Sequence, residues 1–413
     1  MTIILSLITI SLLFLITLIF ALKFRDIAII LFVALTIRIL FLLINNYVFN
    51  LPDAEMDARD MEEFAFLWSQ NSFLEIVRAL NNKDAQFYSR ILGIIYLFLG
   101  RNAIMAQSIS ILFGVACVFI GWLLAKKIWD NNTAKKVALF IALFPSLISY
   151  SVLTMREVYI SFFLLIAMLG IVNWSSKQDL KSIILIIFGF YVASKFHGAS
   201  IFGLFVFFGV IFFNSILTTL KLLKKKLIDF KIIIFLIFSF IILSLYLFDI
   251  IKFSYVGSFE YASNLSNLKV EINTRLKGNA AYPDWLKLNS PYELLYEIPI
   301  RVFYFLLSPF IWDVKSPAHL IGLLDSLLYF ILIFLIIKNI KSIWKKPALK
   351  LILLILIIYF IIFSVGVSNF GSGIRHRSKF VIELILLAGP LLPKFIIFDK
   401  KKFFEKFLKF IRF

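Results

Sequence analysis

TIILSLITISLLFLITLIFAL at residues 2–22 and IAIILFVALTIRILFLLINNYV at residues 27–48 open the chain as two long apolar runs. Hydrophobic residues make up 62% of the 413 and charged residues only 16%, which is too little charge for a soluble domain. About twenty apolar residues in a helix cross the hydrocarbon core of a bilayer. We therefore predict an all-α, polytopic integral membrane protein that forms one domain over 1–413. Its eleven predicted spans are 2–22, 27–48, 103–125, 137–153, 158–174, 182–194, 199–219, 232–250, 320–337, 351–368 and 378–397.

The segment between the second and third spans, residues 49–102, is acidic although the chain is basic. Its first part, LPDAEMDARDMEEFAFLWSQNSFLEIVRALNNKDA at 51–85, has eight carboxylates and three basic side chains, whereas the whole chain carries a formal charge of +19. Phe64, Phe66 and Trp68 lie beside Glu62 and Glu63, a pattern that predicts an amphipathic interfacial helix. An acid cluster at a membrane surface can accept a proton, hold a divalent cation or bind a cationic substrate.

The loops between the spans alternate in basic content, and this alternation predicts the topology. The positive-inside rule assigns the lysine-rich loops to the cytoplasm: 23–25, 126–136, 177–181, 221–231, 338–350 and the tail from 394. The outer face then holds 49–102, 156–157, 195–197, 251–297, 313–319 and 369–377. This assignment requires 86–102 and 298–312 to be interfacial or re-entrant helices, and it makes 251–319 a second outer unit. We expect an inner (plasma) membrane protein with its N-terminus outside and its C-terminus in the cytoplasm.

Most of the unusual polar residues fall on the predicted outer face, so we expect any chemistry there. Nucleotides are scarce on that side, and the sequence has no Walker A loop and no G-x-G-x-x-G motif. An enzyme at this face needs an activated substrate that the membrane delivers, such as a lipid-linked phosphate.

Four stretches resemble the C-type membrane glycosyltransferases (GT-C). They are Asp57-Ala58 with Phe64-Ala65, the run 105–153 with its proline-ended helix, the pair Arg156-Glu157, and SNFGSGIRHRSKF at 368–380. The layout is most similar to bacterial family 39-like members, relatives of protein mannosyltransferases and lipid A aminoarabinose transferases. The extra first helix and the basic tail depart from the usual layout of that family.

The resemblance implies that Asp57 acts as a general base, taking a proton from the acceptor as it attacks the sugar. Such a base must lie within hydrogen-bond reach of the acceptor hydroxyl. Asp53 is the second catalytic candidate. The alternative is that Asp53, Asp57 and Asp60 are solvated loop acids, or that one of them caps the helix that starts near Arg59.

Arg375, His376 and Arg377 form the densest cation cluster on the predicted outer face. A guanidinium binds phosphate in bidentate geometry, and preorganised cations stabilise the charge that develops on a phosphate leaving group. We predict that all three bind the donor phosphate. The alternative is an arginine pair that anchors a helix end to lipid headgroups.

Arg156 and Lys195 are two further candidates for binding the donor phosphate. Ionisable residues that interrupt apolar runs are functional hypotheses by default, although a simple turn or a snorkelling lysine explains them as well.

Arg38, in the middle of the second span, needs a partner or a wet cavity. Loop 251–297 suits either sugar stacking or a membrane-interface belt, through Tyr255, Tyr261, Tyr282, Trp285 and Tyr292.

No cofactor is certain from the sequence. The three histidines, His197, His319 and His376, are far apart, and no H-E-x-x-H or C-x-x-C motif occurs. If a metal binds, it is Mg²⁺ or Mn²⁺ at Asp53 and Asp57, because these ions favour oxygen ligands.

The sequence therefore predicts a glycosyltransferase of cell-envelope glycan biosynthesis. It would move a sugar from a polyprenyl phosphate to a glycan, lipid or protein acceptor on the outer face, with membrane lipid as a further partner and no nucleic acid. One alternative is an O-antigen-type polymerase or ligase, which also relies on outer-face arginines and a histidine but needs no base in the first loop. The other is a flippase or transporter of lipid-linked glycans, although transporters tend to show internal repeats and we find none.

Overall fold

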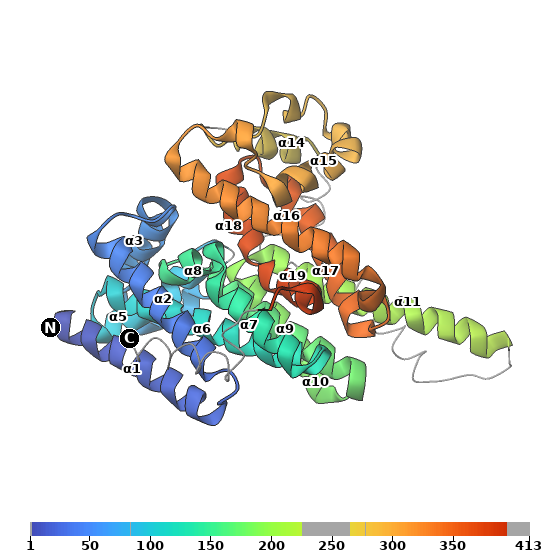
Figure 1. Cartoon of the computed structure of the whole chain (residues 1–413). Coiled ribbons are helices and arrows are strands. Elements are labelled where there is room, and N and C mark those ends of the chain that lie inside the picture. The colour runs from blue at the N-terminus through green and yellow to red at the C-terminus, as the bar shows by residue number, and fades with distance from the viewer. Residues whose placement is uncertain (1, 83, 225–264, 277, 395–413) are drawn as a thin grey trace, which may run out of the picture.

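The computed structural model describes residues 2–82, 84–224, 265–276 and 278–394, and these residues form helices and no strand (Figure 1). The α-helices are α1 (Thr2–Lys23), α2 (Ala28–Tyr47), α3 (Arg59–Trp68), α4 (Phe73–Ala79), α5 (Phe87–Leu99), α6 (Ala103–Ile128), α7 (Asn131–Leu143), α8 (Pro145–Val152), α9 (Glu157–Lys177), α10 (Leu180–Phe196), α11 (Phe202–Lys224), α14 (Leu265–Thr274), α15 (Leu294–Leu307), α16 (Pro317–Trp344), α17 (Pro347–Gly366), α18 (Phe370–Ser378) and α19 (Val381–Ala388). The short helices are η1 (Ala54–Ala58), η2 (Gly198–Ile201), η3 (Asp284–Leu286), η4 (Pro291–Glu293), η5 (Ile311–Asp313) and η6 (Gly389–Leu391).

Seven helices of the described residues are long and apolar enough to cross a membrane, or eight if the bent pair α7–α8 is one span. They lie where the sequence predicts spans, on α1, α2, α6, α9, η2–α11, α16 and α17. The described part of the chain is therefore all-helical, and the protein is a polytopic membrane protein, as predicted.

The other predicted spans have different outcomes. The run 182–194 lies in α10, a 17-residue helix, and the run 378–397 contains the 8-residue helix α19. The predicted span 232–250 lies outside the described residues. The segments predicted to stay interfacial hold α5 and α15. These helices have 13 and 14 residues, which is too short to span the hydrocarbon core of a bilayer.

α6 and α9 lie at the centre of the bundle, and α1 lies at its edge. Most residues of α6 and α9 are buried, whereas α1 exposes a long apolar surface, as expected of a helix that faces lipid. Glycine lets α10 pack closely on α9, because a Cβ at Gly189 would lie 2.5 Å from the backbone nitrogen of Ala167.

A proline divides the predicted span 137–153 into α7 and α8, which meet at an angle of 56°. Pro145 starts α8, and the break leaves carbonyls at the end of α7 without helical donors. Arg38 of α2 uses one of them: it donates to the carbonyl of Ala142 at 3.2 Å and to Ser151 Oγ of α8 at 2.8 Å. Arg38 thus finds the partners that an ionisable residue inside a span requires.

Basic side chains gather at one end of the bundle. Lys126 and Lys135 lie 3.8 Å and 3.9 Å from Asp26, and Lys136 donates to the carbonyls of Pro390 and Leu392 at 2.9 Å. These contacts join three segments that the charge pattern assigns to the same side of the membrane.

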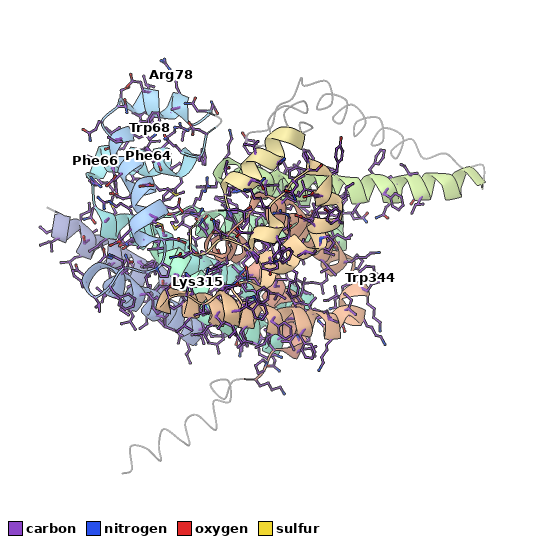
Figure 2. All side chains as sticks on the ribbon, turned by 90° about the horizontal axis from the view of Figure 1, so that it is seen from above. Phe64, Phe66, Trp68, Arg78, Lys315 and Trp344 are labelled. Carbon is purple, nitrogen blue, oxygen red and sulfur yellow. The ribbon has the colours of Figure 1, made fainter. Side chains whose placement is uncertain are left out.

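Two lobes lie at the other end of the bundle, where Figure 1 shows α3 apart from α14 and α15. The first lobe holds α3, α4 and α5, and Figure 2 shows Phe64, Phe66, Trp68 and Arg78 gathered there, away from Trp344. The second lobe is α14 to η5, with Trp285, Tyr292 and Trp312 exposed on it. Tyr255 and Tyr261 of the predicted outer loop lie outside the described residues.

Candidate functional site

Backbone contacts from the second lobe hold the start of α18. The backbone N–H of Tyr282 donates to the carbonyl of Ser368 at 3.0 Å, and that of Phe370 donates to Ala280 at 2.9 Å. Asn369 caps α18, because its side chain accepts from the backbone N–H of Ser372 at 2.7 Å. α18 therefore starts at a fixed position between the lobe and the bundle.

Helical geometry separates the three residues of the Arg375-His376-Arg377 run. Successive residues of an α-helix are rotated by about 100°, so Arg375 and Arg377 point in nearly opposite directions. Arg375 reaches the acidic segment, whereas Arg377 points into the bundle. A cluster in the sequence is thus two separate environments in space.

The side chain of Arg375 lies among carboxylates from two other parts of the chain. Its guanidinium contacts the carboxylate of Asp57, and its Nε lies 4.0 Å from Glu157 Oε1 at the start of α9. The Arg375 side chain is 15% exposed and that of Asp57 is 46% exposed. Burial lowers the pKa of Arg375, and the carboxylate of Asp53 opposes that shift. The pair thus lies at the border between the buried bundle and solvent.

The segment that carries Asp53 and Asp57 is held against the end of α8. Asp53 adopts a left-handed backbone conformation, with φ of 67°, and accepts from the Tyr150 hydroxyl at 2.9 Å. Thr154 donates to the carbonyl of Ala58 at 2.9 Å. These two contacts hold η1 between them, so the Asp57 carboxylate faces α18.

Lys379 is a candidate site residue that the sequence reasoning missed. It is fully buried between α18 and α19, with its Nζ 3.7 Å from Glu157 Oε1 and 2.7 Å from His376 Nδ1. The rings of His376 and His197 lie 5.4 Å apart, centroid to centroid. An ionisable residue two positions after Arg377 and just before an apolar run could have signalled this role.

Arg156, the residue before α9, lies near this cluster. Its guanidinium donates to the carbonyl of Phe196 at 3.2 Å. Four polar atoms of the cluster are buried without a hydrogen-bond partner among the described residues: Arg156 Nε, Glu157 Oε2, His197 Nδ1 and Arg375 Nε. Native interiors leave few such atoms, so these four make this region a candidate binding site. The surroundings of Arg377 hold further ones, among them Arg377 Nε and Asp325 Oδ1.

Lys195 lies at the end of α10, next to the Phe196 that accepts from Arg156. Its ammonium group lies over the ring of Tyr191, 5.4 Å from the centroid. That position is adjacent to the cluster, and the structure gives no contact between Lys195 and Arg375.

Arg377 has a different environment from Arg375. It is fully buried, lies 3.0 Å from Asp325 of α16, and donates to the carbonyls of Leu306 and Ser308 at 2.9 Å and 2.7 Å. Its guanidinium carbon also lies 4.5 Å from the centre of the Tyr329 ring. Arg377 therefore connects α18 to α15 and α16.

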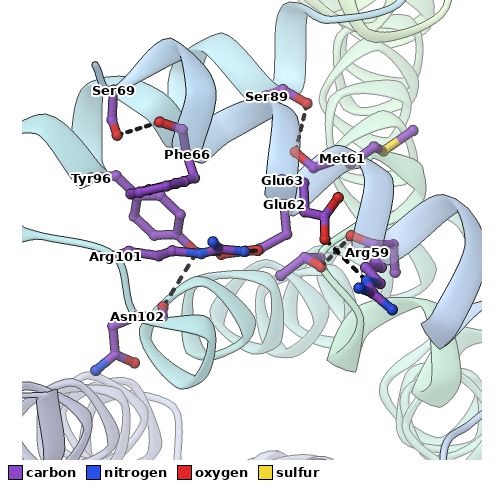
Figure 3. A network of polar contacts seen from close by, with 12 residues as sticks. Arg59, Met61, Glu62, Glu63, Phe66, Ser69, Ser89, Tyr96, Arg101 and Asn102 are labelled. Carbon is purple, nitrogen blue, oxygen red and sulfur yellow. Dashed lines mark hydrogen bonds and ion pairs between the residues drawn. The ribbon is translucent and has the colours of Figure 1, made fainter.

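The acidic lobe has its own internal network, shown in Figure 3. Glu62 is mostly buried and accepts from the Tyr96 hydroxyl at 2.8 Å and from Arg101 Nε at 2.9 Å. Glu63, its neighbour, is exposed and pairs with Arg59 one helical turn away. Glu62 therefore holds the amphipathic helix α3 to α5 and to the loop before α6.

The metal prediction concerns Asp53 and Asp57. Among the described residues, no three histidine, cysteine, aspartate or glutamate side chains form a group that could hold a metal ion. Mg²⁺ commonly binds one or two carboxylates and completes its shell with water and substrate phosphate. Binding of Mg²⁺ or Mn²⁺ at this pair of carboxylates stays a prediction.

The fold and this cluster define the class as a polytopic, all-helical membrane protein with a charged site at one end of its bundle. No known family model matches the chain, and no curated protein is similar to it.

Proposed function

We propose that this protein is a C-type glycosyltransferase of the family 39-like type. It would move a sugar from a polyprenyl phosphate to an acceptor on the extracytoplasmic face of the inner membrane. The observation that carries the proposal is the contact between Arg375 and Asp57. It brings a carboxylate and a partly exposed guanidinium together at one end of the bundle, where a donor sugar bound between them would have its phosphate on Arg375 and its opposite face toward Asp57.

In the proposed reaction, Arg375 and the cations around it bind the donor phosphate. The acceptor hydroxyl attacks the anomeric carbon from the face opposite the phosphate and forms the new glycosidic bond. The bond between that carbon and the phosphate oxygen breaks, and its electron pair leaves with the polyprenyl phosphate. The acceptor proton passes to Asp57, and the anomeric configuration inverts.

The polar atoms near Arg375 support a phosphate site. Lys379 is buried within 3.7 Å of a single carboxylate oxygen, and Arg156 Nε and His197 Nδ1 have no partner among the described residues. Phosphate oxygens accept strong charge-assisted hydrogen bonds from such donors. We assign donor binding to Arg375, His376 and Arg156, place Lys195 at the edge of the site, and assign Arg377 to structural support.

Asp53 is proposed to position the catalytic segment, because its carboxylate accepts from Tyr150 at 2.9 Å. A second role, as a ligand of Mg²⁺ or Mn²⁺ with Asp57, makes a separate prediction. Treatment with EDTA would abolish transfer, and adding either ion back would restore it. Full transfer in EDTA would mean that no metal is needed.

An Asp57→Asn variant in lipid nanodiscs tests the proposal. The probes are polyprenyl-phosphate sugars extracted from the source membrane, and mass spectrometry measures donor binding and transfer separately. We expect the variant to bind donor and to lose transfer, because the amide cannot accept the proton. Asp60→Asn is the matched control, since Asp60 lies on the same segment and is exposed.

The alternatives give different results in the same assay. Full activity of Asp57→Asn would favour the O-antigen-type polymerase or ligase, which needs no base in this segment. Transport of the intact lipid-linked sugar without transfer would favour a flippase. Mass spectrometry of surface glycans from a deletion strain would identify the sugar.

A further inference from the structure

His376, which is partly buried, and Lys379, which is fully buried, lie one helical turn apart on either side of the end of α18. Lys379 Nζ lies 2.7 Å from His376 Nδ1, a normal hydrogen-bond distance. An ammonium group has three donors and no acceptor, so in this bond it must donate. The Nδ1 atom must then carry no proton.

We propose that Lys379 is a positioning residue that fixes His376 as the neutral tautomer with its proton on Nε2. In a neutral imidazole one nitrogen donates and the other accepts, and the partner of one nitrogen decides which. With Nδ1 occupied as acceptor by Lys379, His376 offers a single donor, Nε2–H. The role of this N–H group rests on the proposed function: Nε2–H gives one hydrogen bond to the phosphate of the polyprenyl-linked sugar, and His376 does not serve as a base.

The surroundings of the pair favour this arrangement. Glu157 Oε1 lies 3.7 Å from Lys379 Nζ and supports the ammonium form, and Lys379 lies over the ring of Phe363 at 5.3 Å. Burial lowers the pKa of Lys379, and Glu157 opposes that shift. Measurements are therefore best made at a mildly acidic pH, near 6, where the ammonium is favoured.

His376 itself is surrounded by basic side chains from three parts of the chain. Arg375 and Lys379 flank it in sequence, His197 faces it from the end of α10, and Arg156 lies beside α9. Glu157 is the nearby carboxylate. Burial, followed by the charge of Lys379 and then His197, holds the pKa of His376 well below its ordinary value. These groups keep the ring neutral, so that a tautomer is defined.

The chain has only three histidines, which makes the tautomer directly measurable. Protein labelled with ¹⁵N-histidine is placed in lipid bilayers at pH 6 and examined by solid-state NMR, which separates protonated from unprotonated ring nitrogens. The variants His197→Gln and His319→Gln assign the His376 signals. We expect an unprotonated Nδ1 and a protonated Nε2 on His376. A proton on Nδ1, alone or on both nitrogens, would overturn the proposal.

Lys379→Met tests whether the lysine sets the tautomer. We expect the His376 signals to change to a mixture of tautomers, whereas unchanged signals would overturn the proposal. Lys338→Met is the matched control, because Lys338 also lies over an aromatic ring, that of Phe334, at 4.5 Å. If Lys379→Met fails to fold because it leaves Glu157 buried and alone, Lys379→Met with Glu157→Gln removes both charges.

Activity gives a second readout. The side-chain amide of glutamine places an N–H near Nε2, whereas that of asparagine places it near Nδ1. We expect His376→Gln to retain at least about tenfold more transfer than His376→Asn, because only the glutamine amide can replace the hydrogen bond from Nε2–H to the charged phosphate. Higher transfer by His376→Asn than by His376→Gln would overturn the assignment of Nε2–H as the hydrogen-bond donor. The NMR result stands without any transfer assay, so failure of the proposed function and failure of this inference are distinguishable.

Discussion

Arg375 contacts Asp57 across 318 residues of sequence, and this ion pair joins the acidic segment to the short helix α18. Each partner is held by other contacts, Arg375 near Glu157 and the Asp57 segment through Tyr150 and Thr154. The pair therefore combines a supported cation with a half-exposed carboxylate, and it is the centre of the proposed site.

Replacing Arg375 should reduce transfer strongly and leave folding nearly intact. Arg375→Ala should reduce turnover at least about a hundredfold, the cost of losing one preorganised donor to a developing charge. Arg375→Lys should restore little, because lysine lacks the planar fork of the guanidinium. Single-turnover transfer by purified variants, normalised to folded protein, measures both effects. Near-normal turnover of the alanine variant would remove Arg375 from the site.

Replacing Arg377 should instead reduce the amount of folded protein. Removing one member of a buried ion pair costs about 3–5 kcal/mol, because it leaves the other charge buried and alone. Arg377 and Asp325 are both almost fully buried. Fluorescence-detected size-exclusion chromatography after heating should show an earlier loss of monodisperse Arg377→Ala protein. The double variant Arg377→Met with Asp325→Leu should recover much of that loss.

That result separates two roles for Arg377. Wild-type stability with a hundredfold lower turnover would mean that it binds the donor phosphate, as the sequence alone predicts. A lower yield with normal turnover of the folded fraction would mean that it supports α18.

Glu62 and Glu63 form a natural comparison within one helix. Glu62→Ala should loosen the acidic lobe, since it removes charged hydrogen bonds worth about 1.5–3 kcal/mol each. Glu63→Ala removes only an exposed pair with Arg59, worth about 0.5 kcal/mol or less. Hydrogen–deuterium exchange of peptides from α3 and α5 should rise in the first variant alone. Equal exchange in both would mean that the network in Figure 3 does not hold this lobe.

The protein should lose stability as the pH falls below about 6.5, the ordinary pKa of histidine. Burial is the main cause that lowers the pKa of both His197 and His376 well below that value. Below pH 6.5 the unfolded chain therefore binds more protons than the folded chain, so acid favours unfolding. Melting temperatures in nanodiscs between pH 7.5 and 5 measure the slope. His376→Gln should flatten it.

Reporter fusions test the orientation of the bundle. Fusions at Asn131 and Lys345 should report the cytoplasm, because the positive-inside rule places the lysine-rich loops there. Fusions at Asn82 and Asn279 should report the outer face. A cytoplasmic Asn82 would put the acidic lobe on the wrong side for a lipid-linked donor and would contradict the proposed mechanism.

Much of the fold follows from the sequence, because a bilayer imposes a length and an apolar composition on each span. The predicted runs 2–22, 27–48 and 351–368 correspond to α1, α2 and α17 within a few residues. The lengths of the segments 86–102 and 298–312, which hold α5 and α15, also indicated that they are too short to span the membrane. The bend at Pro145 was visible as a proline, but its angle of 56° depends on how α7 and α8 pack.

The residues of the site were visible in the sequence, whereas their grouping was decided by tertiary structure. The acidic segment and the cation cluster at 375–377 were conspicuous in an apolar chain, and the resemblance to C-type glycosyltransferases pointed to Asp57 within that segment. The sequence could not separate Arg375 from Arg377, since helix rotation and the position of Asp325 give one a partly exposed site and the other a buried ion pair. It also could not bring Lys379 beside Glu157 and His376, because α9 and α18 meet only when the bundle is packed. Apolar length thus determines which segments enter the membrane, and the packing of those segments determines which charges meet.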